Sequence, residues 1–349
     1  MKFNKDNIIH PNIYLIDMLK TLNIDLDSFV NEIKVEKKEI DDFINGGSIT
    51  TNLAIKFAEF FNVSEKLWFN LQKNYDEMYE QEFLDIEKKY LKYFSNNILN
   101  LLNITNKDLK TTINSLHHLF RISSFEELSK KDLYSFCSVG KAKKITEKET
   151  VLQNAWIKWA CSKANYKTTK EYSKKKLINN LSLLRTYIID NNHFPYDIEK
   201  VFAECGIVFV CLPYFEGSNV SGAIKWSKDR KKVMLAINDY GKLADRIWFN
   251  IFHEIGHIIN GDQKQEQVFD EYPKQSIEEI KANEFARDVL VPNDSFQKFL
   301  EKFIFQKQEI ITFAKTINSV PYIIIGRLEK DGFLKYNSFP ELRRKYFFS

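Results

Sequence analysis

The segment His253-Glu254-Ile255-Gly256-His257 has the residue types and the spacing of a metal site. Residues four positions apart on an α-helix project from the same face, about one turn from each other, so both imidazoles can reach one ion. The carboxylate beside the first histidine is then placed to take a proton from a water on that ion. This spacing predicts a zinc site with the metal ligands His253 and His257 and the general base Glu254.

A catalytic zinc ion usually has three protein ligands and keeps one position open for water. The other histidines lie far upstream, at His10, His117, His118 and His193. We therefore expect a carboxylate from the amphipathic segment 278–292, which is rich in acids and ends at a proline. Its periodicity does not choose among three candidates, Glu278, Glu279 and Glu284.

The same part of the chain predicts the helix and the strands that must position these residues. Apolar residues at helical spacing predict a helix around the histidines that ends near Gly261. Upstream, residues 206–213 form a predicted strand, and residues 221–227 and 232–238 form a predicted hairpin around the turn 228–231. A strand, a hairpin and a histidine-bearing helix predict a small α+β metallopeptidase core within residues 181–349.

The rest of the chain reads as helical. Short apolar runs over residues 12–75, such as Tyr14, Met18, Leu19 and Leu22, predict several short helices in an N-terminal all-α domain, residues 1–80. Residues 81–180 are predicted as a helical linker region without a motif. The predicted fold class is thus α+β, with an all-α domain, a helical middle and a C-terminal metallopeptidase domain.

His253–His257, together with the pattern A-N-x-F-A-x-x-x-L-x-P over residues 282–292, resembles the ImmA/IrrE metallopeptidases, a gluzincin-like family of bacteria and phages. The resemblance implies Zn²⁺ as cofactor. It also selects Glu279 as the third metal ligand, since the family's glutamate lies four residues before the position of Asn283 and thirteen before that of Pro292. Asn283 would then orient a ligand from one turn further along the helix.

Two further segments match the same family. Ser221-Gly222-Ala223 matches its edge-strand motif, which implies that Ser221, Gly222 and Ala223 bind an extended substrate by pairing with its backbone. Residues 320–328, Val-Pro-Tyr-Ile-Ile-Ile-Gly-Arg-Leu, match near the end of the domain.

The N-terminal helices resemble the HigA-type antitoxin branch of the XRE helix-turn-helix family. The resemblance rests on His10-Pro11, on residues 40–46 and on residues 63–75. It makes Lys37 and Lys38 candidate DNA-binding residues. Residues 31–51, however, carry three lysines against five acids, and carboxylates oppose the phosphate contacts that dominate DNA affinity. DNA is therefore a doubtful partner, and we favour a scaffold that contacts protein.

A basic stretch, residues 141–176, has eleven lysines against three glutamates, interleaved with Trp156, Trp159, Tyr166 and Tyr172. Such a face can follow a nucleic-acid backbone. The alternative, which we favour, is a solvated surface whose tryptophans lie in the core.

The composition excludes some classes of protein but does not indicate a function. A net charge of +4 indicates no partner, and the four cysteines lack the spacing of a disulfide framework or a zinc cluster. No signal-peptide pattern and no long apolar run is evident, so a cytoplasmic protein without membrane contact is expected. The basic, aromatic tail 342–349 is expected to dock on its own domain.

Together these patterns predict a cytoplasmic zinc-dependent endopeptidase coupled to a helix-turn-helix module. Its expected partner is a protein substrate, a repressor or antitoxin-like regulator cleaved or inactivated in a stress, phage or toxin–antitoxin response; a homodimer is left open. The alternative is an antitoxin-type transcriptional regulator whose metallopeptidase-like domain senses or binds without proteolysis.

Overall fold

The computed structural model separates into two compact units, residues 1–89 and 90–349, which are described in turn. The predicted domain boundaries at residues 80 and 180 stay a prediction. The described residues are 9–105, 108–130, 135–139 (backbone only), 145–164, 170–190, 193–261 and 277–348.

The N-terminal unit is helical throughout its described residues. Its core is aromatic: Phe57 packs edge-on against Trp68 and beside Phe29, and all three are fully buried. The helices are α1 (Pro11–Thr21), α2 (Leu26–Ile33), α3 (Lys37–Ile44), α4 (Thr51–Phe61) and the first part of α5 (Glu65–Leu91).

One detail of this unit differs from the predicted pattern. The buried face of α1 passes through Leu15 and Leu19, whereas Tyr14 and Leu22 are 41% and 54% exposed. Leu22 lies beyond the last residue of α1, so it cannot continue the helical face. The predicted apolar stripe of this helix was therefore wrong at Tyr14 and Leu22.

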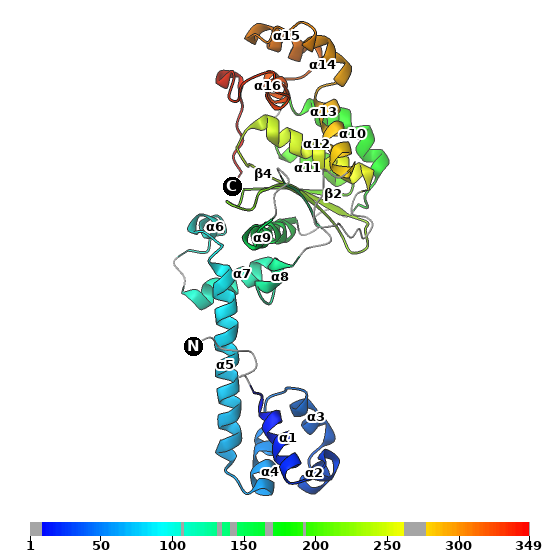
Figure 1. Ribbon diagram of the computed structural model, residues 1–349. Coiled ribbons are helices and arrows are strands. Elements are labelled where there is room, and N and C mark those ends of the chain that lie inside the picture. The colour runs from blue at the N-terminus through cyan, green and yellow to red at the C-terminus, as the bar shows by residue number, and fades with distance from the viewer. Residues whose placement is uncertain are drawn as a thin grey trace. The chain divides into compact units, whose positions relative to one another are not determined.

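The second unit is built around a four-stranded sheet in the order β1-β3-β4-β2. The strands are β1 (Ser135–Val139), β2 (Ile207–Leu212), β3 (Val220–Trp226) and β4 (Val233–Asn238). β3 and β4 form the predicted antiparallel hairpin, and β2 pairs parallel to β4. Figure 1 shows α12 (Ala244–Asn260) on one face of the sheet and α9 (Glu147–Ala164) on the other.

The face covered by α9 explains the aromatic residues of the basic stretch. Trp156 is fully buried and donates its indole N–H to the carbonyl of Pro213 at 3.0 Å, and Trp159 stacks on Phe215 with 5.2 Å between ring centroids. The expectation that these tryptophans lie in the core is confirmed. Lysines 174–176 are exposed, whereas residues 141–144 and 165–169 of the same stretch lie outside the described residues.

The remaining helices surround this sheet. They are α6 (Asn96–Leu101), α7 (Leu109–Phe120), α8 (Glu126–Ser129), α10 (Lys174–Thr186), α11 (Tyr196–Glu204), α13 (Ile277–Leu290), α14 (Asn293–Leu300), α15 (Lys307–Thr316) and α16 (Pro321–Lys330). The apolar sides of the helices from α10 onwards join those of α12 and of β2, β3 and β4 in one large core. The α+β fold class and the helical N-terminus agree with the prediction.

The middle region departs from the prediction at one place, because Ser135–Val139 is a strand and not part of a helical linker. A strand of five residues between polar segments is too short to show a clear period. Its pairing partner, β3, lies more than eighty residues further along the chain, which local reasoning cannot reach.

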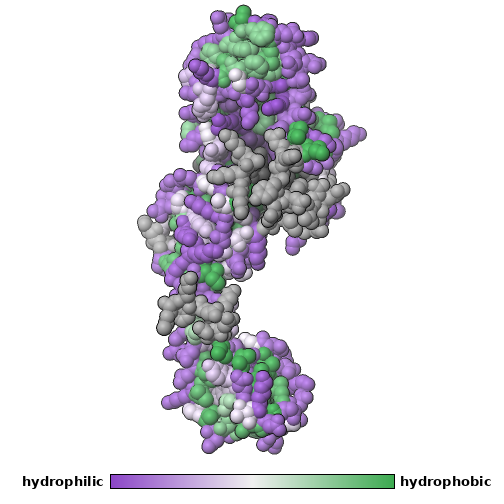
Figure 2. Space-filling view, in the orientation of Figure 1, coloured by the Kyte–Doolittle hydropathy of each residue, from purple (hydrophilic) through white to green (hydrophobic). Residues whose placement is uncertain are grey.

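The molecular surface seen in Figure 2 is mostly hydrophilic. An apolar area is visible at the end formed by α14 and α15. Phe303 and Ile304, in the connection between these two helices, are 83% and 51% exposed. Among the residues described here, no helix combines the length and the apolar content needed to cross a bilayer.

Candidate metal centre

The helix that carries the histidines, α12, is held by a continuous apolar face. Ile247, Ile251, Ile255 and Ile258 follow helical spacing and are buried in the sheet core. The helix ends at Asn260, and Gly261 follows with φ +77°, a conformation that glycine adopts without strain. The predicted helix and its end are confirmed. The packing of its apolar face against the core holds the histidines in position.

The first turn of α12 is closed by the C-terminal tail. The amide of Ala244 donates to the carbonyl of Arg344 at 2.9 Å, which satisfies an N–H that a helix start leaves without a partner. The buried guanidinium of Arg343 pairs with Asp245 at 3.2 Å and also with Glu329 of α16. Burial raises the pKa of Asp245, an effect that the charge of Arg343 opposes. The expectation that the tail docks on its own domain is confirmed.

The second helix of the site, α13, lies unusually close to α12. A Cβ at Gly256 would lie 3.0 Å from the Cα of Ala282 and 3.3 Å from the ring of Phe285. The glycine inside the histidine motif therefore lets the two helices approach, and this approach brings the start of α13 to the histidines. The motif predicted the histidines and the glutamate, but it gave no signal for this role of Gly256.

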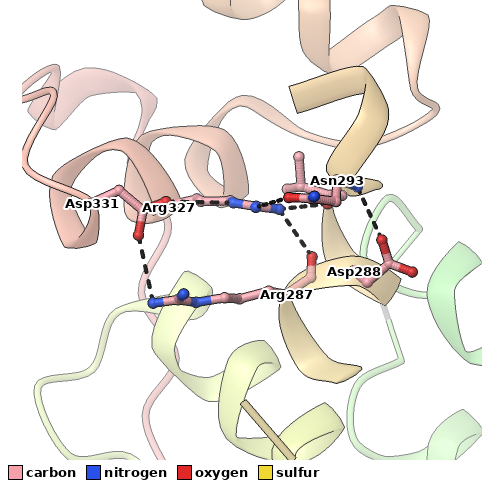
Figure 3. Close-up of polar contacts among 6 residues, drawn as sticks. Arg287, Asp288, Asn293, Arg327 and Asp331 are labelled. Carbon is pink, nitrogen blue, oxygen red and sulfur yellow. Dashed lines mark hydrogen bonds and ion pairs between the residues drawn. The ribbon is translucent and has the colours of Figure 1, made fainter. Parts of the chain in front are cut away.

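A polar network fixes the far end of α13 (Figure 3). The guanidinium of Arg327 on α16 donates to the carbonyl of Val291 at 2.6 Å and to the side chain of Asn293 at 3.0 Å. It also lies 4.0 Å from the ring centroid of Phe296. Arg327 thus satisfies a carbonyl that the helix end would leave open.

Three side chains from these two helices converge. Nε2 of His253 lies 3.0 Å from Nε2 of His257. The carboxylate of Glu279 lies 3.5 Å from Nε2 of His253 and 3.4 Å from Nε2 of His257. Both histidines are buried, and the Glu279 side chain is 25% exposed. The three ligand atoms lie within 4.8 Å of one another, a grouping that can hold a metal ion.

The donor set fits zinc. Imidazole nitrogens and a carboxylate oxygen are ligands that Zn²⁺ takes in proteins, with bonds of about 2.0–2.2 Å. In a tetrahedral site such bonds put neighbouring donor atoms about 3.3–3.6 Å apart, close to the distances found between these three side chains. One side of the group, at Glu279, is partly open to solvent, as a site that admits a water and a substrate requires.

Glu254 lies beside this group and away from solvent. It is fully buried, and neither of its carboxylate oxygens has a hydrogen-bond partner among the described residues. Burial raises the pKa of Glu254 to about 8, the charge of His257 lowers it and that of Glu279 raises it further. In the metal-free protein this carboxyl group therefore holds its proton at neutral pH, and a nearby cation would favour its ionised form.

The strand β3 meets Glu254 at a glycine. A Cβ at Gly222 would lie 2.7 Å from Oε1 of Glu254, so a glycine gives the carboxylate its space. Ala223 is buried and Ser221 is half-buried. The prediction that these residues lie on an edge strand was wrong, since β3 pairs with β4 on one side and with β1 on the other.

The other predicted site residues are placed as follows. Asn283 lies one turn after Glu279 and is half-buried, and its predicted action on a ligand stays a prediction. Lys37 and Lys38 belong to α3 of the N-terminal unit and are exposed, as are Asp41 and Asp42 on the same helix.

Comparison with known proteins adds one match. Residues 204–317 match the family described as Peptidase_M78, IrrE N-terminal-like domain. This segment contains β2, β3, β4, α12 and α13, and so the whole candidate metal centre. The matched part of the second unit is therefore a metallopeptidase-like domain. A search among curated proteins found no match to the chain.

Proposed function

We propose that this chain is a zinc-dependent endopeptidase in which His253, His257 and Glu279 hold the ion and Glu254 is the general base. The observation that carries the proposal is the convergence of two buried imidazoles and the partly exposed carboxylate of Glu279 beside Glu254, a buried carboxyl group without a hydrogen-bond partner among the described residues. The similarity of residues 204–317 to a peptidase family supports the same reading.

Each residue has a defined task in this mechanism. When bound, the zinc ion would polarise the scissile carbonyl and increase the acidity of a water molecule. Glu254 accepts the proton of that water and passes it to the leaving amine, because the positive charge of a bound ion would keep this buried carboxyl group in the ionised form that a base requires. Gly222 leaves room for this carboxylate, while Gly256 and Arg327 hold α13, and with it Glu279, in position.

We propose further that the N-terminal unit is a helix-turn-helix scaffold that recognises a protein, so that the peptidase acts on a regulator such as a repressor or an antitoxin-like protein. Residues 34–36 join α2 to α3, a tight connection typical of such scaffolds. The exposed acids of α3, next to Lys37 and Lys38, oppose phosphate contacts and favour a protein partner over DNA.

The first test is metal content. Protein purified without a metal-binding tag is expected to contain about one zinc per chain, and His257→Ala and Glu279→Ala are expected to lose it, because three protein ligands are the usual number. Absence of zinc in the parent protein, even after metal is supplied, would contradict the metal site.

The second test is proteolysis. The zinc-loaded protein and Glu254→Gln are incubated with a peptide library made from a bacterial proteome, and new peptide ends are identified by mass spectrometry. Cleavage by the parent protein alone supports the endopeptidase, with a loss of about 10²–10⁴-fold in the variant. Zinc binding without cleavage by either protein would favour the alternative, a regulator whose metallopeptidase-like domain senses or binds.

A further inference from the structure

The edge of the sheet beside the metal centre is occupied by the chain itself. β1 pairs antiparallel with β3, Ser135 opposite Lys225, Phe136 opposite Ile224 and Cys137 opposite Ala223. β1 comes from the middle of the sequence, outside the matched residues 204–317. β1 therefore reaches the sheet from a part of the chain that the family match does not cover.

The pairing changes register next to the general base. Cys137 is opposite Ala223 and Val139 is opposite Val220, so one residue of β1, Ser138, faces two residues of β3, Ser221 and Gly222. This is a β-bulge, which interrupts the regular ladder. Gly222 is the residue whose missing side chain accommodates Glu254. The backbone of β1 thus runs past the position where β3 touches the general base.

An extended substrate that adds to β3 would need the backbone groups that β1 uses. The opposite side of β3 is taken by β4, so only the β1 side can accept another strand. Occupation by β1 and occupation by a substrate are therefore mutually exclusive. β1 has only five residues and an irregular register, so its hold on β3 is weaker than that of β4.

We propose that β1 is a built-in competitor of the substrate: it keeps the peptidase latent, and an extended protein segment must displace it from β3 to reach the metal centre. This inference rests on the proposed function, because it assigns a regulation to the same site. It names the occupant, residues 135–139, and the surface, the backbone edge of Val220–Trp226 that β1 covers.

The experiment uses the full zinc-loaded chain carrying Glu254→Gln, so that binding is measured without hydrolysis. In this background, Phe136→Pro with Cys137→Pro is compared with Phe136→Ala with Cys137→Ala. Along an antiparallel strand successive N–H groups point to opposite sides, so the paired prolines remove the donor to β3 whichever residue carries it. The alanine variant changes the same side chains and keeps both backbone donors.

The probe is a fluorescent peptide with the sequence of residues 133–141, kept reduced, and its binding is followed by fluorescence anisotropy beside a scrambled peptide. We expect the proline variant to bind it at least about tenfold more tightly than the alanine variant, because the edge is free. Hydrogen exchange of residues 220–226 is expected to become faster in the proline variant only. Should that variant not fold, replacement of residues 135–139 by Gly-Ser-Gly-Ser-Gly replaces it.

Two results would overturn the inference. One is equal peptide affinity of the two variants although exchange shows that the edge has opened. The other is exchange at residues 220–226 that is as fast in the parent protein as in the proline variant, which would mean that β1 is not held there. Neither result depends on catalysis, so an absence of proteolysis would count against the proposed function and leave this binding test intact.

Discussion

The helix pairs α2–α3 and α12–α13 place their polar residues in opposite ways. In α12–α13 three polar side chains turn toward one another between the helices, and the buried His253 and His257 meet the partly exposed Glu279 there. In α2–α3 the polar side chains turn outward, and Lys37 and Lys38 stand exposed beside acids. Burying a polar group without a partner costs free energy, so a cluster of buried polar side chains indicates a specific ligand or reaction. An outward mixture of charges is compatible with many partners.

The largest expected effect tests which carboxylate belongs to the inward cluster. Glu279→Ala should weaken zinc binding by more than the about 10–100-fold typical of removing a group that only supports a ligand. Glu278→Ala, on the neighbouring residue, should leave zinc affinity almost unchanged. Competition with a chromophoric chelator measures both affinities. The reverse order of the two variants would shift the ligand by one residue and break the comparison at its centre.

The next effect concerns the stability of the metal-free protein. Because the pKa of Glu254 is raised from 4.5 to about 8, the folded state keeps a proton that the unfolded state loses above pH 4.5. Stability is therefore lost as pH rises from about 4.5 to about 8, by about 3–5 kcal/mol. Glu254→Gln, which cannot ionise, should lack this dependence. Urea unfolding of both proteins with a chelator at pH 5, 6.5 and 8 measures the difference, and parallel curves would contradict it.

A smaller effect is expected from one added methyl group. Gly222→Ala would put a Cβ 2.7 Å from Oε1 of Glu254, and the carboxylate must move to admit it. We expect about 10–100-fold lower kcat, since small displacements of a catalytic group are costly, with zinc content unchanged. The measurement is kcat on a peptide that the parent protein cleaves. An unchanged kcat in Gly222→Ala would contradict the role of Glu254 as general base next to Gly222.

The smallest effect is predicted for the outward pair. Lys37→Ala with Lys38→Ala should change the retention of random duplex DNA in a gel shift at 150 mM salt by less than about twofold, because the surrounding acids already oppose phosphate. Removing the acids, by Asp41→Asn with Asp42→Asn, should increase retention. A large loss of tight DNA binding in the lysine variant would make α3 a DNA-reading helix and overturn the protein-contact proposal.

Sequence reasoning reached the inward cluster because its parts are local. The spacing of His253 and His257 and the apolar residues of α12 are readable within five turns of one helix. The choice of Glu279 over Glu278 needed family resemblance, since both lie beside the apolar face of α13. The strands β2, β3 and β4 were predicted because each is a β-rich run next to a turn signal.

What could not be predicted depends on contacts between distant residues. β1 becomes a strand only through its pairing with β3, and this pairing turns the expected edge strand into an internal one. The burial of Arg343 against Asp245 and Glu329 joins three segments that no periodicity relates. The approach of α13 to Gly256 depends on Ala282, which a sequence shows only as one more apolar residue.

The docking of the tail also sets an order of events during synthesis. Asp245 and Glu329 lie at the start of α12 and in α16, and their shared cation, Arg343, is made after both. A nascent chain that still lacks Arg343 has two buried acids without this counter-charge and an open first turn on α12. The enclosure of the helix that carries the histidines is therefore completed only after the ribosome has passed residue 343. Until then the first turn of this helix lacks the contacts that the tail supplies in the finished chain.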